Sequence, residues 1–450
     1  MRANEMTASA AAAAIRDGEL SAEQLVQACL DRIAQTEDRV GAWTYLDPVH
    51  ALEQALAADR LQRGGATLGP LHGLPVGIKD IFDTADMPTE NGTVLHAGRR
   101  PAEDATVVAL LRAAGAVILG KTVTAELAVY APGKTTNPHD ARRTPGGSSS
   151  GSAAAVAAAM VPLAVGTQTN GSVLRPASYC GVHGYKPSHG SISRHGVLKQ
   201  STTLDQVGVF ARSVDDVALI AGELFRYDGK DPDVRPDTRL SLTEGRSLDA
   251  GAPLRIAFVK TPLWPNATET AQQAFTALAA RCTDVVREVE LPPVFESAVA
   301  CHRTIMESDL ANNYGALYAS GKERLSDALR EMIERGQRYT GAEYSKARDG
   351  IAQLSRALDD LFAGCDAVMT PATTGVAPLG LASTGSPMFC TIWTLCGVPA
   401  ISLPILHGEE GMPLGVQLVA ARRNDAQLLR IAKRLEARCA AVAVAVEHAL

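Results

Sequence analysis

Three segments of the sequence combine serine, glycine and lysine in patterns that serve nucleophilic catalysis. They are LPVGIKDIF at 74–82, GGSSSGS at 146–152 and GTQTNGS at 166–172. A serine hydroxyl attacks a carbonyl only when a neighbouring base removes its proton. Lys79 lies between apolar neighbours, and burial lowers the pKa of a lysine, which leaves it neutral and able to act as that base. An ion pair between Lys79 and Asp80 or another carboxylate is the alternative.

The segment at 146–152 fits several interpretations. A phosphate-binding loop needs a lysine after its last glycine, and Ser152 stands there instead. A flexible linker is disfavoured because the segment runs directly into an apolar, alanine-rich stretch. Gly147 to Gly151 matches GxSxG with Ser149 as the nucleophile, and histidines that could complete a triad follow it. From these residues alone, an α/β-hydrolase-type esterase that uses Ser149 stays open.

A longer series of ordered blocks resembles the amidase signature family and covers most of the chain. The blocks are GPLHGLPVGIKD (69–80), TNPHD (136–140), GGSSSGSAAAVAA (146–158), GTQTNGSVLRPASYCGV (166–182), GYKPSHG (184–190), LDQVG (204–208), GVPAISLP (397–404) and MPLGVQLVA (412–420). The resemblance implies an α/β/α layered fold and an amidohydrolase that cleaves C–N bonds of linear amides through an acyl-enzyme.

The resemblance also implies roles for residues of the three segments. Lys79 matches the family's catalytic lysine, and Ser172 matches its nucleophile. Ser148 matches its bridging serine, which the family holds after a cis peptide bond, here the bond from Gly147. Backbone N–H groups at and before the nucleophile would stabilise the oxyanion. They belong to Thr169, Asn170, Gly171 and Ser172.

The nucleophile segment departs from the common family pattern at three points. Gln168 replaces an aspartate, and Asn170 replaces a glycine; asparagine tolerates a left-handed backbone, so the turn is expected to survive. Arg175 follows the nucleophile by three positions rather than two, which resembles the malonamidase-like branch. There it is a candidate anchor for an acidic or polar substrate, with a structural salt bridge as the alternative. Further candidate substrate contacts are Gln168, Ile392 and Trp393.

These features predict an amidase for a small amide or carbamate substrate, with ester and urethane hydrolysis as side activities, as in urethanase-like relatives. An amidotransferase A-type subunit that needs partner proteins is another alternative, and SVLRP at 172–176 argues against it. The last alternative is a non-catalytic binding module.

Composition excludes several other classes. The chain has 450 residues and a formal net charge of -6, with 43 basic and 49 acidic residues well mixed, so no basic surface indicates nucleic acid. The histidines show no metal-binding spacing, and we expect neither metal nor cofactor. The uncharged stretch between Thr144 and Arg175 contains Pro162 and several glycines, which disfavours a membrane span. The eight cysteines form no CxxC pair. We expect a cytoplasmic monomer or homodimer with no nucleic-acid or membrane partner.

Alternating helices and short apolar strands must position the three segments. Strands are predicted at 74–82, 116–120, just after Pro162, and at 254–260, 365–372, 399–405 and 414–420. Helices are predicted at 268–287, 296–337, 342–363 and 425–440, and a capping box begins another at Ser21 that runs to about Ile33. This alternation predicts an α/β fold, as one large α/β/α layered domain around a central mixed sheet. The domain would span 1–450: a helical segment (about 1–65), a motif-bearing core (about 66–225), a polar surface loop (about 226–253) and a C-terminal half that completes the sheet (about 254–450).

Overall fold

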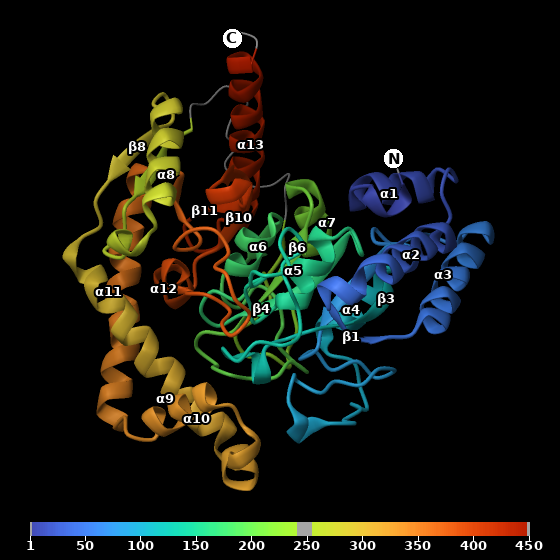
Figure 1. The fold of residues 1–450 in the computed structure, drawn as a ribbon, viewed down its shortest axis with the longest axis horizontal. Coiled ribbons are helices and arrows are strands. Elements are labelled where there is room, and N and C mark those ends of the chain that lie inside the picture. The colour runs from blue at the N-terminus through green and yellow to red at the C-terminus, as the bar shows by residue number, and fades with distance from the viewer. Residues whose placement is uncertain (1, 241–253, 448–450) are drawn as a thin grey trace.

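A mixed sheet of eleven strands organises the computed structural model, which describes residues 2–240 and 254–447 (Figure 1). The strands lie in the order β1-β3-β2-β4-β6-β5-β10-β11-β9-β7-β8. Their bounds are Trp43–Leu46 (β1), Pro75–Lys79 (β2), Val117–Thr122 (β3), Leu163–Gln168 (β4), His183–Lys186 (β5), Gln206–Ala211 (β6), Ile256–Val259 (β7), Val286–Val289 (β8), Ala367–Pro371 (β9), Ala400–His407 (β10) and Pro413–Val419 (β11). All seven predicted strands are present, and β1, β5, β6 and β8 are additional to the prediction.

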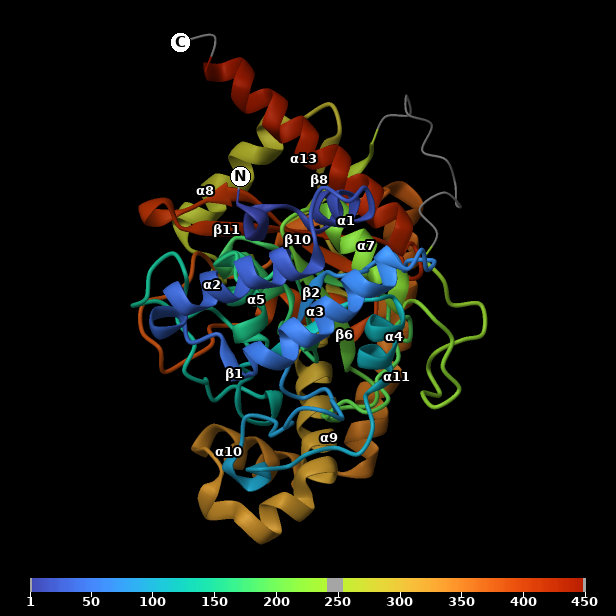
Figure 2. The same cartoon turned by 90° about the vertical axis from the view of Figure 1, so that its right-hand side faces the viewer.

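Helices cover both faces of the sheet and make three layers (Figure 2). Helix α4 (Thr106–Ala113) joins β2 to β3, and α5 (Ser150–Ala157) joins β3 to β4. Because β3 and β4 lie on opposite sides of β2, right-handed crossovers place α4 and α5 on opposite faces. Helix α6 (Leu174–Cys180) packs beside α5, and α7 (Val214–Leu224) packs beside α4. The predicted α/β/α architecture around a mixed sheet is confirmed.

Three parallel strands carry the segments of interest to one edge of the sheet. Strand β2 pairs in parallel with both β3 and β4. Lys79 is the last residue of β2, and Gln168 is the last residue of β4. Since parallel strands end at the same edge, the loops after β2 and β4 lie side by side there, as ligand sites of α/β sheets commonly do.

A group of helices in the C-terminal half packs around a second hydrophobic core (Figure 1, lower left). It consists of α9 (Ala298–Gly321), α10 (Asp327–Gly336), α11 (Gly341–Gly364) and α12 (Met388–Leu395). The single helix predicted at 296–337 is wrong, because the chain turns between α9 and α10. Ser326 begins α10 as its N-cap, where its side chain accepts a hydrogen bond from the backbone N–H of Leu329.

The remaining helices come from the N-terminal part of the chain, from the segment between β7 and β8, and from the C-terminal end. They are α1 (Ala8–Arg16), α2 (Ala22–Val40), α3 (Pro48–Arg63), α8 (Glu269–Arg281) and α13 (Asp425–Glu447). The capping box at Ser21 is confirmed, but α2 continues past Ile33 to Val40. Strand β8 replaces the end of the helix predicted at 268–287. Of the polar loop predicted at 226–253, residues 226–240 form turns without helix or strand, and 241–253 lie outside the described residues.

Candidate active site

Lys79 is fully buried at the end of β2 and contacts hydroxyl groups. Its Nζ lies 2.8 Å from Ser148 Oγ and 2.9 Å from Thr167 Oγ1. Burial lowers the pKa of Lys79 well below its ordinary value; the negative charge of Asp205 raises it in part, and the positive charge of Arg175 lowers it further. A neutral amine beside a serine hydroxyl can accept a proton from it.

The ion pair considered for Lys79 forms elsewhere. Asp80 points away from it and pairs with Lys121 of β3, with 3.2 Å between Asp80 Oδ1 and Lys121 Nζ. Both side chains are buried. Lys121 also donates to the carbonyl of Phe82 and to the hydroxyl of Thr89. The two consecutive residues Lys79 and Asp80 therefore belong to different clusters, and no carboxylate of the described residues pairs with Lys79.

Ser148 lies on the loop between β3 and α5, with the peptide bond from Gly147 in the cis conformation. Its neighbours fasten this loop to the sheet. Ser149 Oγ donates to the carbonyl of Thr167 at 3.2 Å and accepts from the N–H of Thr167 at 3.3 Å. Ser152 Oγ donates to the carbonyl of Val165 at 2.9 Å. Ser149 is fully buried and bonded to backbone, a setting that opposes its use as an exposed nucleophile.

Residues 169–172 form the turn between β4 and α6, and Ser172 lies at its end, buried with a small exposed fraction. Among the described residues, no backbone carbonyl accepts a hydrogen bond from the N–H groups of this turn. Free N–H groups beside a nucleophile suit an oxyanion hole. Asn170 does not have a positive φ, so the left-handed conformation considered for it is not used.

Four side chains hold this turn in place. Gln168 is fully buried; its Oε1 accepts from the N–H groups of Val173 and Leu174 at 2.8 and 3.0 Å. Asp205 Oδ1 accepts from Thr169 Oγ1 at 2.6 Å. His302 Nε2 lies 2.9 Å from the carbonyl of Thr169 and must donate to it. Thr394 Oγ1 donates to the carbonyl of Asn170 at 2.6 Å. Gln168 thus caps the start of α6, and its amide is used within the protein.

Arg175 is fully buried, and its guanidinium holds the loop between β3 and α5 that carries Ser148, which we call the serine loop. It donates to the carbonyl of Gly147 at 2.5 Å, to the carbonyl of Gly385 at 2.8 Å and to Thr384 Oγ1 at 3.1 Å. Its Nε, also buried, has no partner among the described residues. These contacts fit the structural role that was the alternative for Arg175. Its partners are carbonyl and hydroxyl oxygens, however, and not the carboxylate of a salt bridge.

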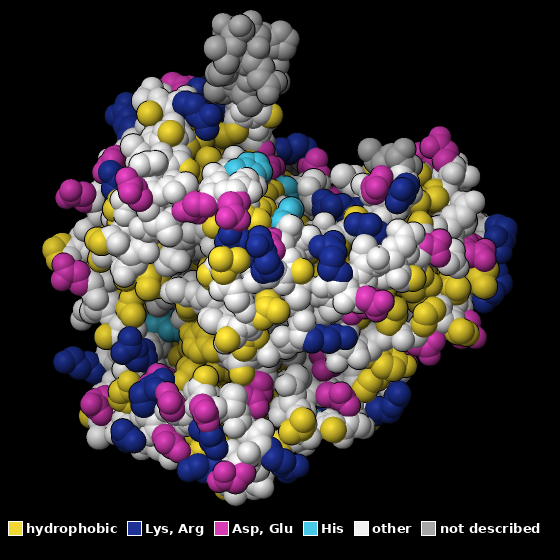
Figure 3. Space-filling view, in the orientation of Figure 1, with side chains coloured by type: hydrophobic (Ala, Val, Ile, Leu, Met, Phe, Trp, Pro, Cys, Tyr) yellow, Lys and Arg dark blue, Asp and Glu magenta, His cyan; other side chains and the backbone are white. Residues whose placement is uncertain are grey.

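A cleft of about 580 Å³ opens beside the turn at residues 169–172, which we call the nucleophile turn after the role predicted for Ser172. Asn170 and Tyr130 border it on the side of the turn. Its other residues come mainly from α9, α10 and α12, among them His302, Met306, Met332, Met388 and Thr391. Figure 3 shows hydrophobic side chains gathered in a hollow above the part of the molecule that holds α10. Ile392 and Trp393, predicted as substrate contacts, do not border this cleft. Both lie in the second hydrophobic core, which is the core-packing role that their apolar side chains favour.

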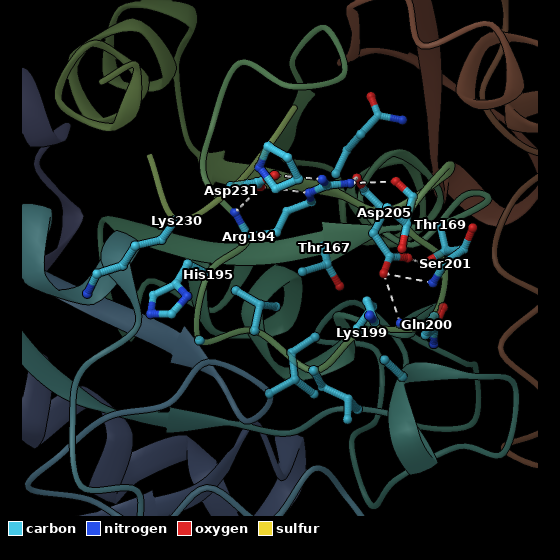
Figure 4. Close-up of a pocket in the computed structure, with 18 residues that line it drawn as sticks. Thr167, Thr169, Arg194, His195, Lys199, Gln200, Ser201, Asp205, Lys230 and Asp231 are labelled. Carbon is cyan, nitrogen blue, oxygen red and sulfur yellow. Dashed lines mark hydrogen bonds and ion pairs between the residues drawn. The ribbon is translucent and has the colours of Figure 1, made fainter. Parts of the chain in front are cut away.

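A second cavity, of about 320 Å³, lies at the end of β4, and Figure 4 shows the residues that line it. Thr167, Thr169 and Asp205 line it, together with the segment 194–202. Asp205 also accepts from the N–H groups of Gln200 and Ser201. Burial raises the pKa of Asp205 to about 6, against the effect of these hydrogen bonds. Thr167 separates this cavity from Lys79, because it lines the cavity and its hydroxyl contacts Lys79 Nζ.

Histidine, cysteine, aspartate and glutamate side chains gather nowhere in residues 2–240 and 254–447 in a group of three that could hold a metal ion. Within the same residues, none of the helices combines the length and the apolar character that crossing a bilayer requires.

Comparison with known proteins identifies the class. The sequence matches the Amidase family over residues 24–429, and the chain belongs to that family and is an amidohydrolase. It is 36% identical to the A-type subunit of glutamyl-tRNA(Gln) amidotransferase from Chloroflexus aggregans, in an alignment of 470 positions that covers 95% of each chain. Among solved structures it is similar to a native peptide amidase from Stenotrophomonas maltophilia, with 30% identity, a TM-score of 0.79 and 97% of each chain covered.

A further solved structure is described as an unexpected vestigial protein complex that reveals the evolutionary origins of an s-triazine catabolic enzyme. It shares 29% identity with this chain at a TM-score of 0.88, over 96% of this chain and 98% of that one. These matches also confirm the fold, since they extend over nearly the whole sheet and its helices.

Proposed function

We propose that the enzyme hydrolyses C–N bonds of small amides through an acyl-enzyme on Ser172, with Ser148 and Lys79 moving the proton. The observation that carries the proposal is the contact of 2.8 Å between Ser148 Oγ and the buried Nζ of Lys79. The resemblance to the family supplies Ser172 as the nucleophile, at the end of the adjacent turn.

In the first half of the reaction, Ser172 Oγ attacks the carbonyl carbon and forms a C–O bond. Its proton passes to Ser148 Oγ, while the Ser148 proton passes to the neutral amine of Lys79. The carbonyl electron pair moves to oxygen, where the N–H groups of 169–172 stabilise the negative charge. Collapse of this intermediate breaks the C–N bond, and the proton returns through Ser148 to the departing nitrogen.

In the second half, water replaces the amine. It attacks the ester carbonyl and loses a proton along the same path, after which Ser172 leaves as a hydroxyl and the acid is released. Lys79 ends the cycle neutral, as it began. Esters and carbamates (urethanes) present the same carbonyl geometry, so we propose them as further substrates.

The second candidate function is that of an amidotransferase A-type subunit, because relatives with 34–36% identity are named as such subunits. We propose instead that this chain acts without protein partners or nucleic acid, as a monomer or homodimer. Support comes from the cleft, whose walls are built by helices of this chain beside its own nucleophile turn.

The proposal is tested by assaying the purified full chain on a panel of simple amides, ureas, carbamates and esters. Ser172→Ala and Lys79→Ala are expected to lower kcat by roughly 10³-fold or more, as loss of an interdependent catalytic group does. Ser149→Ala is the matched control and is expected to keep most of the activity. Labelling with a serine-directed sulfonyl fluoride, followed by peptide mass spectrometry, should place the adduct on Ser172. Activity that survives Ser172→Ala, or a label on Ser149, would contradict the assignment.

A further inference from the structure

Asn170 stands where the cleft meets the nucleophile turn. Two residues of chain span at most about 7 Å, so Asn170 lies beside Ser172. Asn170 is largely buried, and it borders the cleft. In the proposed reaction, Asn170 therefore lies close to the carbonyl that Ser172 attacks.

The backbone does not explain the residue type at this position. Many family members have glycine here, but φ at Asn170 is not positive, so glycine is not needed for the turn and alanine would fit it. What distinguishes this chain at 170 is therefore the side chain and its contacts.

Three contacts fix that side chain and its peptide. Asn170 Oδ1 accepts from Thr391 Oγ1 at 2.8 Å, and Nδ2 lies 3.4 Å from the hydroxyl of Tyr130. Thr394 Oγ1 fixes the carbonyl of the same residue at 2.6 Å. Tyr130 and Thr391 both border the cleft. The side chains of Tyr130, Asn170 and Thr391 thus form a continuous polar bridge between the loop after residue 128 and α12; we call it the Asn170 bridge.

The cleft beyond the bridge has a different character. Met306, Met332, Met388 and Pro387 contribute apolar walls there, beside Arg303 and an ion-paired group of Arg335, Glu307 and Glu331. Methionine side chains adapt their shape to what they contact, whereas the hydrogen-bonded bridge holds one position. The part of the cleft that hydrogen bonds fix is therefore next to the nucleophile turn, and the adaptable part is farther away.

We propose, on the basis of the proposed function, that the Asn170 bridge determines which acyl groups the enzyme accepts. The acyl group stays on Ser172 while the amine leaves and water enters, so it is the group that must lie in the cleft throughout. The bridge admits acyl groups that are unbranched at the carbon next to the carbonyl, and the apolar walls accept a longer chain beyond it. The predicted substrates are amides of straight-chain acids.

The test compares two 4-nitroanilides of equal composition, the butyryl and the isobutyryl derivative, by kcat/KM. One displaced methyl group in a fitted site changes this quantity by about 10–200-fold. The wild-type enzyme is expected to prefer the butyryl compound by at least about ten-fold, and Asn170→Gly and Asn170→Ala to bring the ratio close to one. Thr391→Val keeps the shape of its side chain but releases Asn170 Oδ1, and it is expected to lower the ratio in part.

A second pair of substrates is the control for the leaving group. These substrates are two butyryl anilides, one with and one without a methyl group at the ortho position of the aniline ring. The ratio of their kcat/KM values should be the same in the wild type and in the variants. Thermal unfolding identifies any variant that fails to fold; Asn170→Ala and Thr391→Val then carry the test. An unchanged butyryl-to-isobutyryl ratio in folded Asn170 variants overturns the inference. Failure of the proposed function is distinct, since it shows as activity that is absent from the wild type or independent of Ser172.

Discussion

Three buried lysines lie close to the candidate site, and their partners separate the proposed base from the other two. Lys121 pairs with Asp80, and Lys186 donates to carbonyl oxygens of Pro187 and Val398. Oxygen atoms that only accept hydrogen bonds favour the protonated amine. Lys121 also bonds the hydroxyl of Thr89, but the hydrogen-bond partners of Lys79 among the described residues are hydroxyl groups alone, and a hydroxyl can give a proton as well as accept a hydrogen bond. Burial combined with hydroxyl partners is therefore what suits Lys79 to act as a base.

The charge of Asp205 leads to a prediction on pH dependence. Because Asp205 raises the pKa of Lys79, Asp205→Asn should lower it, and the rising limb of kcat/KM against pH should move to lower pH. The two profiles should approach each other below about pH 6, where Asp205 itself becomes protonated. Asp309→Asn is the control, since Asp309 is half-buried and is not among the charges that shift Lys79. A limb that stays in place, or moves to higher pH, would count against Lys79 as the base.

Burial of Lys79 also predicts that this lysine lowers the stability of the folded protein at neutral pH. Its pKa is lowered in the folded state, so the unfolded chain binds a proton that the folded chain does not, and stability falls as pH drops below the unfolded pKa of about 10.4. Lys79→Met removes this penalty and is expected to raise Tm at pH 7 while abolishing activity.

Lys121→Met is the matched control for that experiment. It leaves Asp80 buried without its cation, which is expected to cost about 3–5 kcal/mol. Differential scanning calorimetry of both variants gives the comparison. Shifts of equal sign for the two lysines would show that the partners described above do not decide their roles.

At the scale of elements, the serine loop depends on close packing between α5 and β3. A Cβ added at Gly151 would lie 2.2 Å from the carbonyl oxygen of Ala42 and 2.4 Å from the N–H nitrogen of Val123, both of them backbone atoms. Gly151→Ala is therefore expected to destabilise the fold by about 1–3 kcal/mol or more and to lower kcat, because Ser148 is on the same loop.

Gly222→Ala in α7 is the control for this packing effect, since a Cβ there meets no atom within 4 Å. It is expected to be neutral or to stabilise the protein by about 0.5–1 kcal/mol, the usual gain when alanine replaces glycine in a helix. Urea unfolding of the two variants, with the activity measured in parallel, tests the prediction. Equal stability of the two alanine variants would argue against the close approach.

Elements with strong local signals were the ones that could be predicted from the sequence. Apolar strands such as β4 and β11 and the capping box at Ser21 follow from patterns of a few residues. Strand β8, with two exposed residues of four, carries little apolar pattern, and the break between α9 and α10 depends on a cap rather than on a proline. The segments at 79, 148 and 172 could be found because serine, lysine and glycine stand in distinctive motifs.

Contacts between distant segments could not be predicted in the same way. Nothing near Asp205 in the sequence shows that it bonds Thr169, nor that His302 supports the same turn from α9. Gln168, Ile392 and Trp393 are candidate substrate contacts because they stand in or near the motifs, and all three are buried. Tertiary packing turned their side chains into the interior, and that information is not local.

At the scale of the whole molecule, one chain supplies both the proposed reacting groups and the walls of the cleft. The purified chain is therefore expected to hydrolyse a simple amide without added proteins or RNA, at a rate per chain that is independent of protein concentration. Size-exclusion chromatography with light scattering, run beside the assay, measures the assembly state. Activity that is seen only after another protein is added would favour the amidotransferase alternative.

The eleven-stranded sheet separates two tasks along the sequence. The proposed reacting groups come from the first half, at the ends of β2 and β4 and on the loop between β3 and α5, while the walls of the cleft come mostly from residues 299–335 and 387–391. Mutations that accumulate in residues 299–335 and 387–391 can alter the range of substrates without changing the proposed reacting groups. A chimaera that receives the segment from α9 to α12 of another family member is then expected to show the substrate range of the donor and the catalytic groups of the recipient. New amidases could arise, by evolution or by engineering, through exchange of this segment alone.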